Sequence, residues 1–136
     1  MIRYLKKLLV IDDHEADLRV VARSFMAAAP GIEIETLKGS ETAVDRIVSG
    51  DSDIVLMDIN MPGLNGLEVL ESARNRTNAT LPVVIMLSTS EDPTDLKAAY
   101  DSGASAYVVK PDTMADFENL ARSIQGFWGA MVSRPV

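Results

Sequence analysis

A short apolar run, residues 54–57, leads directly into a single carboxylate, Asp58, and the turn residues Pro62 and Gly63 follow closely. A continuous apolar run bounded by turn residues is typical of a strand buried on both faces. Asp58 is therefore expected at the carboxyl end of a buried strand, where open α/β sheets bind their ligands. A simpler interpretation stays open at this point, in which Asp58 only starts the turn or accepts a loop N–H.

Other short apolar segments are also expected to be strands, and helix-length segments separate them. With residues 54–57, the predicted strands are residues 8–11, 32–37, 81–87 and 106–109. Strands that alternate with helical patterns favour an α/β fold, a five-stranded parallel sheet covered on both faces by five helices. We expect Ser40 to cap the second helix, and Leu96, Ala99 and Tyr100 to form the buried face of the fourth.

Polar side chains stand where these strands end. Asp12 and Asp13 follow the first strand, Asp58 the third, Ser88 the fourth and Lys110 the fifth. The carboxyl ends of parallel strands meet at one edge of a sheet, so these side chains should gather there. Two carboxylates about 5 Å apart repel by roughly 3 kcal/mol at an effective dielectric constant near 20. The cluster therefore calls for a cation, and oxygen ligands favour Mg²⁺, with Mn²⁺ as the alternative.

An acidic metal site beside a lysine and a hydroxyl suits phosphoryl transfer. Asp58 stands alone at the end of the middle strand and is the candidate nucleophile, which would give an aspartyl phosphate. Asp12 and Asp13 form the kind of pair that ligates metals, and Lys110 can contact phosphoryl oxygens. A plain ion pair between Lys110 and one of these acids is the simpler interpretation, and it would also position the lysine.

Charge and composition narrow the classes of partner. The net charge of −7 argues against a nucleic acid held through its phosphates, and the absence of cysteine excludes disulfides and thiol nucleophiles. The apolar run near the N-terminus is too short for a signal peptide or a membrane span. We therefore expect a soluble, cytoplasmic protein with no membrane partner.

With these residues in order, residues 8 to about 126 resemble a receiver domain of two-component response regulators. The resemblance rests on five separated elements: Asp12-Asp13, Asp58, Ser88, Tyr107 and Lys110-Pro111. It implies a flavodoxin-like, doubly wound sheet of strand order 2-1-3-4-5. We accordingly expect residues 1–126 to be the receiver domain and residues 127–136 to be a tail that continues or follows the last helix.

The resemblance also implies a metal-dependent reaction at Asp58. Asp58 would accept a phosphoryl group from the phosphohistidine of a kinase. Asp13, Asp58 and the backbone carbonyl of Asn60 would bind Mg²⁺, and Asp12 would act through water. The only chemistry expected is the chain's own phosphorylation and dephosphorylation. Asn60 stands where haloacid dehalogenase-type hydrolases carry a second acid, so that alternative is poor. A binding module that is never phosphorylated is a further alternative.

A two-state switch is the third implication. Ser88 would move its hydroxyl toward the phosphoryl group, Tyr107 would turn inward behind it, and Lys110 would precede a cis bond to Pro111. Thr89 departs from the family's usual alanine, so access to the site would be narrower. The only histidine, His14, is expected to be a surface or rim residue.

Signal output would pass through a protein surface, because no output domain follows residue 126. The implied partners are a sensor histidine kinase or phosphotransfer protein and an unidentified downstream protein. Phe127 and Trp128 resemble the tail of single-domain regulators that work with phytochrome-type kinases, some of which form homodimers. Both rings could equally continue the buried face of the last helix.

Overall fold

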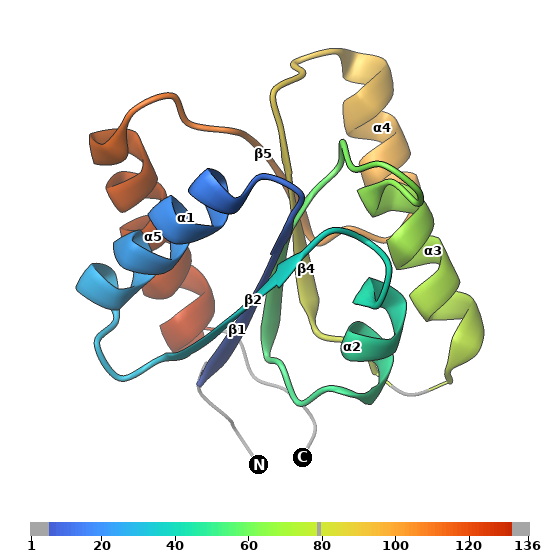
Figure 1. Cartoon of the computed structure of the whole chain (residues 1–136), viewed down its shortest axis with the longest axis horizontal. Coiled ribbons are helices and arrows are strands. Elements are labelled where there is room, and N and C mark those ends of the chain that lie inside the picture. The colour runs from blue at the N-terminus through green and yellow to red at the C-terminus, as the bar shows by residue number, and fades with distance from the viewer. Residues whose placement is uncertain (1–5, 79, 132–136) are drawn as a thin grey trace.

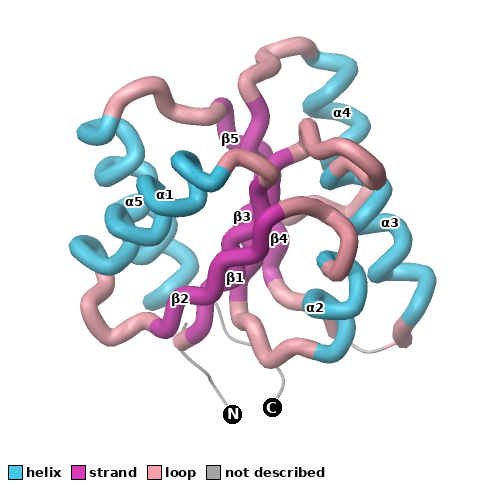
Figure 2. The backbone as a smooth tube through the Cα atoms, in the orientation of Figure 1, coloured by secondary structure: helices cyan, strands magenta, loops and turns pink. Residues whose placement is uncertain are grey.

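The computed structural model describes residues 6–78 and 80–131, and in them strands and helices alternate (Figure 2). The strands are β1 Lys7–Asp12, β2 Glu33–Lys38, β3 Ile54–Asp58, β4 Val83–Ser88 and β5 Ala106–Val109. The helices are α1 Glu15–Ala28, α2 Ala43–Ser49, α3 Gly66–Arg76, α4 Pro93–Asp101 and α5 Met114–Met131. The expected pattern of five strands and five helices is confirmed.

The strands form one parallel sheet in the order β2-β1-β3-β4-β5, as expected. Figure 1 shows α1 and α5 side by side on one face of the sheet and α2, α3 and α4 on the other. β3 lies in the middle of the sheet, and its residues are buried. The carboxyl ends of the strands face upward in Figure 1, so the loops at that edge can carry a shared site.

Alternate residues of the central strands enter two separate cores. One core packs the sheet against α2, α3 and α4, and from the strands it takes Leu9, Ile11, Val55, Met57, Val84 and Met86. The other packs the sheet against α1 and α5, and from the strands it takes Leu8, Val10, Ile54, Leu56 and Ile85. This alternation explains why the runs are apolar at every position, since both faces of each strand are covered.

Two helix starts illustrate how local sequence fixes the boundaries. Asn65 and Glu68 form a capping box at α3, in which each side chain accepts a hydrogen bond from the other residue's backbone N–H. The expectation that Ser40 caps α2 is wrong, because Thr42 occupies the N-cap position. The Ser40 hydroxyl is instead engaged by the carbonyl of Pro62, to which it donates at 3.0 Å. It thereby ties the loop after β2 to the loop after β3.

The predicted buried face of α4 is wrong at two of its three residues. Ala99 is buried, but Leu96 is 41% exposed and Tyr100 is 49% exposed. α4 lies beside β5, a strand of only four residues at the edge of the sheet. The sheet beneath α4 is therefore narrow, and only part of the helix's apolar stripe is covered.

Two further observations concern the helices. α5 extends through Met131, so residues 127–131, assigned above to a tail, continue the last helix. The side chains of Phe127 and Trp128 lie outside the part that the structure describes. Within the described ranges, none of the helices combines the length and apolarity that crossing a membrane requires.

Candidate functional site

The strand-end residues meet at one edge of the sheet. Asp12 ends β1, Asp58 ends β3 and Ser88 ends β4, and all three are buried. Lys110 follows β5 directly, and its backbone N–H donates to the carbonyl of Ser88 at 2.7 Å. This bond fixes where the lysine leaves the sheet, so its side chain can reach back across the edge to the acids.

The ammonium of Lys110 lies among three carboxylates. Its Nζ is 2.8 Å from Asp12 Oδ2, 2.8 Å from Asp17 Oδ2 and 3.8 Å from Asp58 Oδ2. Burial lowers the pKa of Lys110, but hydrogen bonds to Asp12 and Asp17 and the nearby charges outweigh it, so the pKa is raised. The lysine therefore stays an ammonium and is held mainly by Asp12 and Asp17.

The surroundings of Asp58 disfavour the ionised form of its carboxyl group. Burial and the neighbouring charge of Asp12 raise its pKa from 3.8 to about 6, and Asp13 adds to this effect. Lys110 and the backbone N–H of Asn60, which donates to Asp58 Oδ1 at 3.2 Å, oppose the rise. A cation placed beside Asp58 would relieve this unfavourable charge.

The donor set fits a hard divalent cation. One ligand atom from each of Asp12, Asp13, His14 and Asp58 lies within 4.8 Å of the others. Asp13 Oδ1 is buried and makes no hydrogen bond, so its lone pairs can serve a cation. Asn60 is exposed beside Asp58. Carboxylate oxygens of this kind suit Mg²⁺ and Mn²⁺.

Ser88 and Tyr107 lie on neighbouring strands and are linked through the loop after β4. The hydroxyl of Ser88 accepts a hydrogen bond from the backbone N–H of Ser90 at 3.1 Å. The hydroxyl of Tyr107 donates to the carbonyl of Ser90 at 2.6 Å, and its ring is partly buried against the core. Ser90, which the sequence did not single out, therefore connects the two residues.

At this edge, the expectation for the Lys110–Pro111 bond is wrong and the expectation for His14 is met. The resemblance implied a cis bond between Lys110 and Pro111, but the described residues contain no cis peptide bond, so that expectation is wrong. The trans form is the one that X–Pro bonds generally favour. His14 is exposed, with 67% of its side chain accessible, as expected of a rim residue. Asp17, in the first turn of α1, was not predicted as a site residue.

Gly66 shows how tightly α3 approaches the site. A Cβ at this position would lie 2.5 Å from the backbone oxygen of Asp58 and 3.0 Å from Ile59 Cα. Only glycine therefore lets α3 start this close to the end of β3. The missing side chain sets the path of the loop that carries Asn60.

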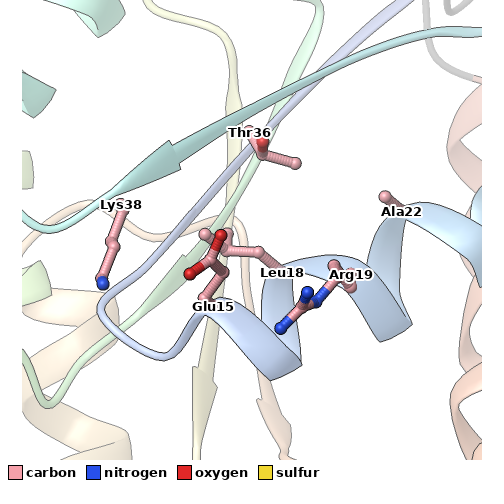
Figure 3. A pocket seen from close by; sticks show the side chains of 6 residues that line it. All are labelled: Glu15, Leu18, Arg19, Ala22, Thr36 and Lys38. Carbon is pink, nitrogen blue, oxygen red and sulfur yellow. The ribbon is translucent and has the colours of Figure 1, made fainter.

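A separate surface hollow of about 330 Å³ lies between α1 and β2 (Figure 3). Glu15, Leu18, Arg19 and Ala22 enter it from α1, and Thr36 and Lys38 enter it from β2. Its lining contains acidic, basic and apolar side chains. It includes none of the residues of the acidic cluster, which we define as Asp12, Asp13, His14 and Asp58. We assign no function to it.

The parallel 2-1-3-4-5 sheet with three acids and a lysine at its carboxyl edge is the arrangement that the resemblance to receiver domains implied. The family model described as the response regulator receiver domain matches residues 8–122. The chain belongs to this family, whose members are typically non-enzymatic modules of two-component systems. Such domains bind divalent metals and interact with histidine kinases or phosphotransfer proteins in general.

A curated relative shares the receiver domain but is much longer than this chain. The chain is 32% identical over 127 residues to the sensory/regulatory protein RpfC of Xanthomonas campestris. The match covers 87% of this chain but only 17% of RpfC. The likeness therefore supports the domain and not the activity of the whole relative.

Solved structures of similar length have the same fold. The response regulator RPA3017, described in red light signalling of R. palustris, has a TM-score of 0.85 and 32% identity, with 97% of this chain and 99% of that chain covered. The phosphorylated cyanobacterial phytochrome response regulator RcpA has a TM-score of 0.85 and 23% identity, over the same shares. The Mn²⁺-bound response regulator Rcp1 has a TM-score of 0.80 and 25% identity, over 96% and 99%.

Proposed function

We propose that this receiver accepts a phosphoryl group onto Asp58 from the phosphohistidine of a histidine kinase or phosphotransfer protein. The observation that carries the proposal is the buried carboxylate of Asp58 at the end of the central strand, with Lys110 and the acid pair beside it. The chain would catalyse only its own phosphorylation and dephosphorylation.

Asp58 supplies the nucleophilic oxygen. With a pKa of about 6, roughly nine in ten Asp58 carboxyls are ionised at neutral pH. A carboxylate oxygen attacks phosphorus, so that an O–P bond forms as the N–P bond to the donor imidazole breaks. The imidazole nitrogen keeps the bonding electron pair and then takes up a proton. The product is an aspartyl phosphate and a neutral donor histidine.

Lys110 contributes electrostatic stabilisation. Its Nζ lies 3.8 Å from Asp58 Oδ2, close enough to contact an oxygen of a phosphoryl group attached to Asp58. Because Asp12 and Asp17 hold the ammonium at 2.8 Å each, it is positioned before the donor arrives. Preorganised charge of this kind needs little rearrangement in the transition state.

The residues proposed to hold the metal are Asp13, Asp58 and the backbone carbonyl of Asn60, with Asp12 acting through water. When bound, Mg²⁺ or Mn²⁺ would offset the negative charge that the carboxylates and the phosphoryl oxygens bring together. The unpartnered oxygen of Asp13 supports this assignment. The Mn²⁺-bound form of the similar protein Rcp1 supports it as well.

Phosphorylation is proposed to change a protein-interaction surface through Ser88 and Tyr107. The Ser88 hydroxyl would turn from the N–H of Ser90 toward the phosphoryl oxygens, and Tyr107 would follow inward. Since the Tyr107 hydroxyl is bound to the carbonyl of Ser90, motion of that loop would reach the exposed α4. The proposed readers of this change are a downstream protein or a second copy of the chain.

The kinase partner is proposed to be of the phytochrome type. The descriptions of RPA3017 and RcpA, which connect those two proteins with red light and phytochrome, support this assignment. The reaction is proposed to take place in the cytoplasm.

Intact-mass measurement after incubation with acetyl phosphate tests the proposed function. We expect a single phosphoryl adduct that requires Mg²⁺ or Mn²⁺, is absent in Asp58→Asn and is kept in the matched control Asp112→Asn, which changes an exposed acid. If the wild type gives no adduct with acetyl phosphate or a phosphorylated kinase, Asp58 is not an acceptor. The chain would then be a receiver-like binding module.

A further inference from the structure

His14 occupies the N-cap of α1 but does not cap the helix. N-cap positions favour Ser, Thr, Asp and Asn because their side chains accept hydrogen bonds from the first free N–H groups. The His14 side chain makes no capping hydrogen bond, and its backbone N–H donates to Asp12 Oδ1 at 2.9 Å. Helix stability therefore does not account for a histidine at this position.

The imidazole of His14 faces the acidic cluster. Its Nδ1 lies 3.1 Å from Asp13 Oδ1, 3.5 Å from Asp12 Oδ1 and 4.0 Å from Asp17 Oδ2. The closest of these approaches is not a hydrogen bond, because Asp13 Oδ1 has no hydrogen-bond partner. His14 Nδ1 and Asp13 Oδ1 thus lie close together without a hydrogen bond between them. A cation that binds both atoms would satisfy this arrangement.

The spacing of the four donors allows them to gather around one ion, with Asp12 acting through water. Donors bound at 2.0–2.2 Å are separated by about 4.2 Å when they lie opposite each other across the ion. The donor atoms of Asp12, Asp13, His14 and Asp58 lie within 4.8 Å of one another. His14 Nδ1 is well inside this limit, at 3.1 Å from Asp13 Oδ1 and 3.5 Å from Asp12 Oδ1.

We propose that His14 Nδ1 is a direct ligand of divalent transition metals at this site and makes the site prefer Mn²⁺ and Co²⁺ over Mg²⁺. The inference deepens the proposed function and rests on the metal site given there. Imidazole nitrogen is a good ligand for first-row transition metals, whereas Mg²⁺ prefers oxygen and gives up its water reluctantly. His14 should therefore add to the binding of Mn²⁺ and Co²⁺ and leave the binding of Mg²⁺ nearly unchanged.

Pulsed electron paramagnetic resonance of the Mn²⁺-loaded, untagged protein gives a direct test. His14 is the only histidine of the chain, so an imidazole nitrogen coupled to the Mn²⁺ electron spin has a single source. We expect this coupling in the wild type and its loss in His14→Phe, which keeps a ring but offers no ligand atom. Mn²⁺ that binds without a nitrogen coupling would overturn the inference and leave the proposed function standing.

Calorimetric titration with Co²⁺ and Mg²⁺ supplies an independent readout. We expect His14→Phe to weaken Co²⁺ binding by at least about tenfold, the scale of losing one metal-site group, and Mg²⁺ binding by less than about twofold. The matched control is Glu15→Gln, which alters charge next to His14 without removing a cluster donor. It should affect both ions equally. An equal loss of both ions in His14→Phe would overturn the inference.

Failure of the underlying metal site would look different. Wild-type protein that binds none of Mn²⁺, Co²⁺ and Mg²⁺ would refute the metal site and the inference together. Asp13→Asn should weaken all three ions, because Asp13 is a proposed ligand irrespective of the metal. The Asp13 variant thus tests the site, and the His14 variant tests its selectivity.

Discussion

Replacing Asp58 by Asn should make the metal-free protein more stable at alkaline pH. The Asp58 carboxyl is 4% exposed, and burial and the charge of Asp12 raise its pKa from 3.8 to about 6. The folded protein therefore holds the ionised form of Asp58 at a cost that the unfolded chain does not bear. Asparagine has nearly the same shape and carries no charge.

The size and sign of the effect follow from the two pKa values. One pKa unit corresponds to 1.36 kcal/mol, so the change from 3.8 to about 6 corresponds to about 3 kcal/mol. Between these pH values the folded state binds more protons than the unfolded state, so stability falls as the pH rises. The loss is absent below about pH 4 and complete above about pH 6. Asp58→Asn does not undergo this loss, so its free energy of unfolding at pH 8 should exceed that of the wild type by about 2–3 kcal/mol.

Urea unfolding, followed by far-ultraviolet circular dichroism in EDTA, measures this difference between about pH 4 and pH 8. The difference in the free energy of unfolding between the wild type and Asp58→Asn should grow as the pH rises from about 4 to 6 and then stay constant. Asp112→Asn, which alters an exposed acid, should show no such curve. A variant that is less stable than the wild type at pH 8, or a difference independent of pH, would refute the reasoning.

Three further substitutions test the surroundings of Asp58 and the start of α3 by urea unfolding. Lys110→Met leaves the buried acids Asp12 and Asp58 without their cation, so it should cost about 3–5 kcal/mol at pH 8 and raise the Asp58 pKa above 6, as read by carboxyl-carbon NMR. Gly66→Ala places a Cβ 2.5 Å from the Asp58 backbone oxygen and should cost about 1–3 kcal/mol. Asn65→Ala removes one half of the α3 capping box and should cost about 1 kcal/mol.

Each of these substitutions has a control or a contrary outcome. Gly126→Ala matches Gly66→Ala, but a Cβ there meets nothing within 4 Å, so the helix should gain about 0.5–1 kcal/mol. Equal effects of the two alanines would refute the steric argument. A drop in the Asp58 pKa in Lys110→Met would mean that the lysine does not favour the ionised carboxyl. If Asn65→Ala leaves the free energy of unfolding unchanged, water satisfies the N–H group of Glu68 as well as the Asn65 side chain does.

The sequence predicted the sheet well because each strand carries the information locally. Leu8 to Ile11 and Ile54 to Met57 are apolar at every position, and that pattern has few stable solutions other than a strand covered on both faces. The faces of α4 were harder to predict. Spacing identifies an apolar stripe, but it does not reveal whether a neighbour covers Leu96 and Tyr100.

The site was predictable to the extent that its residues sit at strand ends. Asp12, Asp58 and Lys110 converge because a parallel sheet brings its carboxyl ends to one edge. Asp17 and His14 come from the start of α1, and their directions depend on where that helix begins and on side-chain torsions. Nothing in the residue pattern fixes those variables, so their contacts emerged only from the structure.

The charges at this edge connect Asp17 and His14, whose contacts the sequence did not predict. Three carboxylates, those of Asp12, Asp17 and Asp58, lie around the ammonium of Lys110, and Asp13 adds a fourth carboxylate beside Asp12 and Asp58. Asp12 and Asp17 engage the lysine at 2.8 Å, so Asp58 receives only part of its charge at 3.8 Å. The proposed phosphoryl group on Asp58 would bring further negative charge to the same edge. The proposed metal ion would offset this charge, and the proposed role of His14 would make the identity of that ion depend on a residue of this chain.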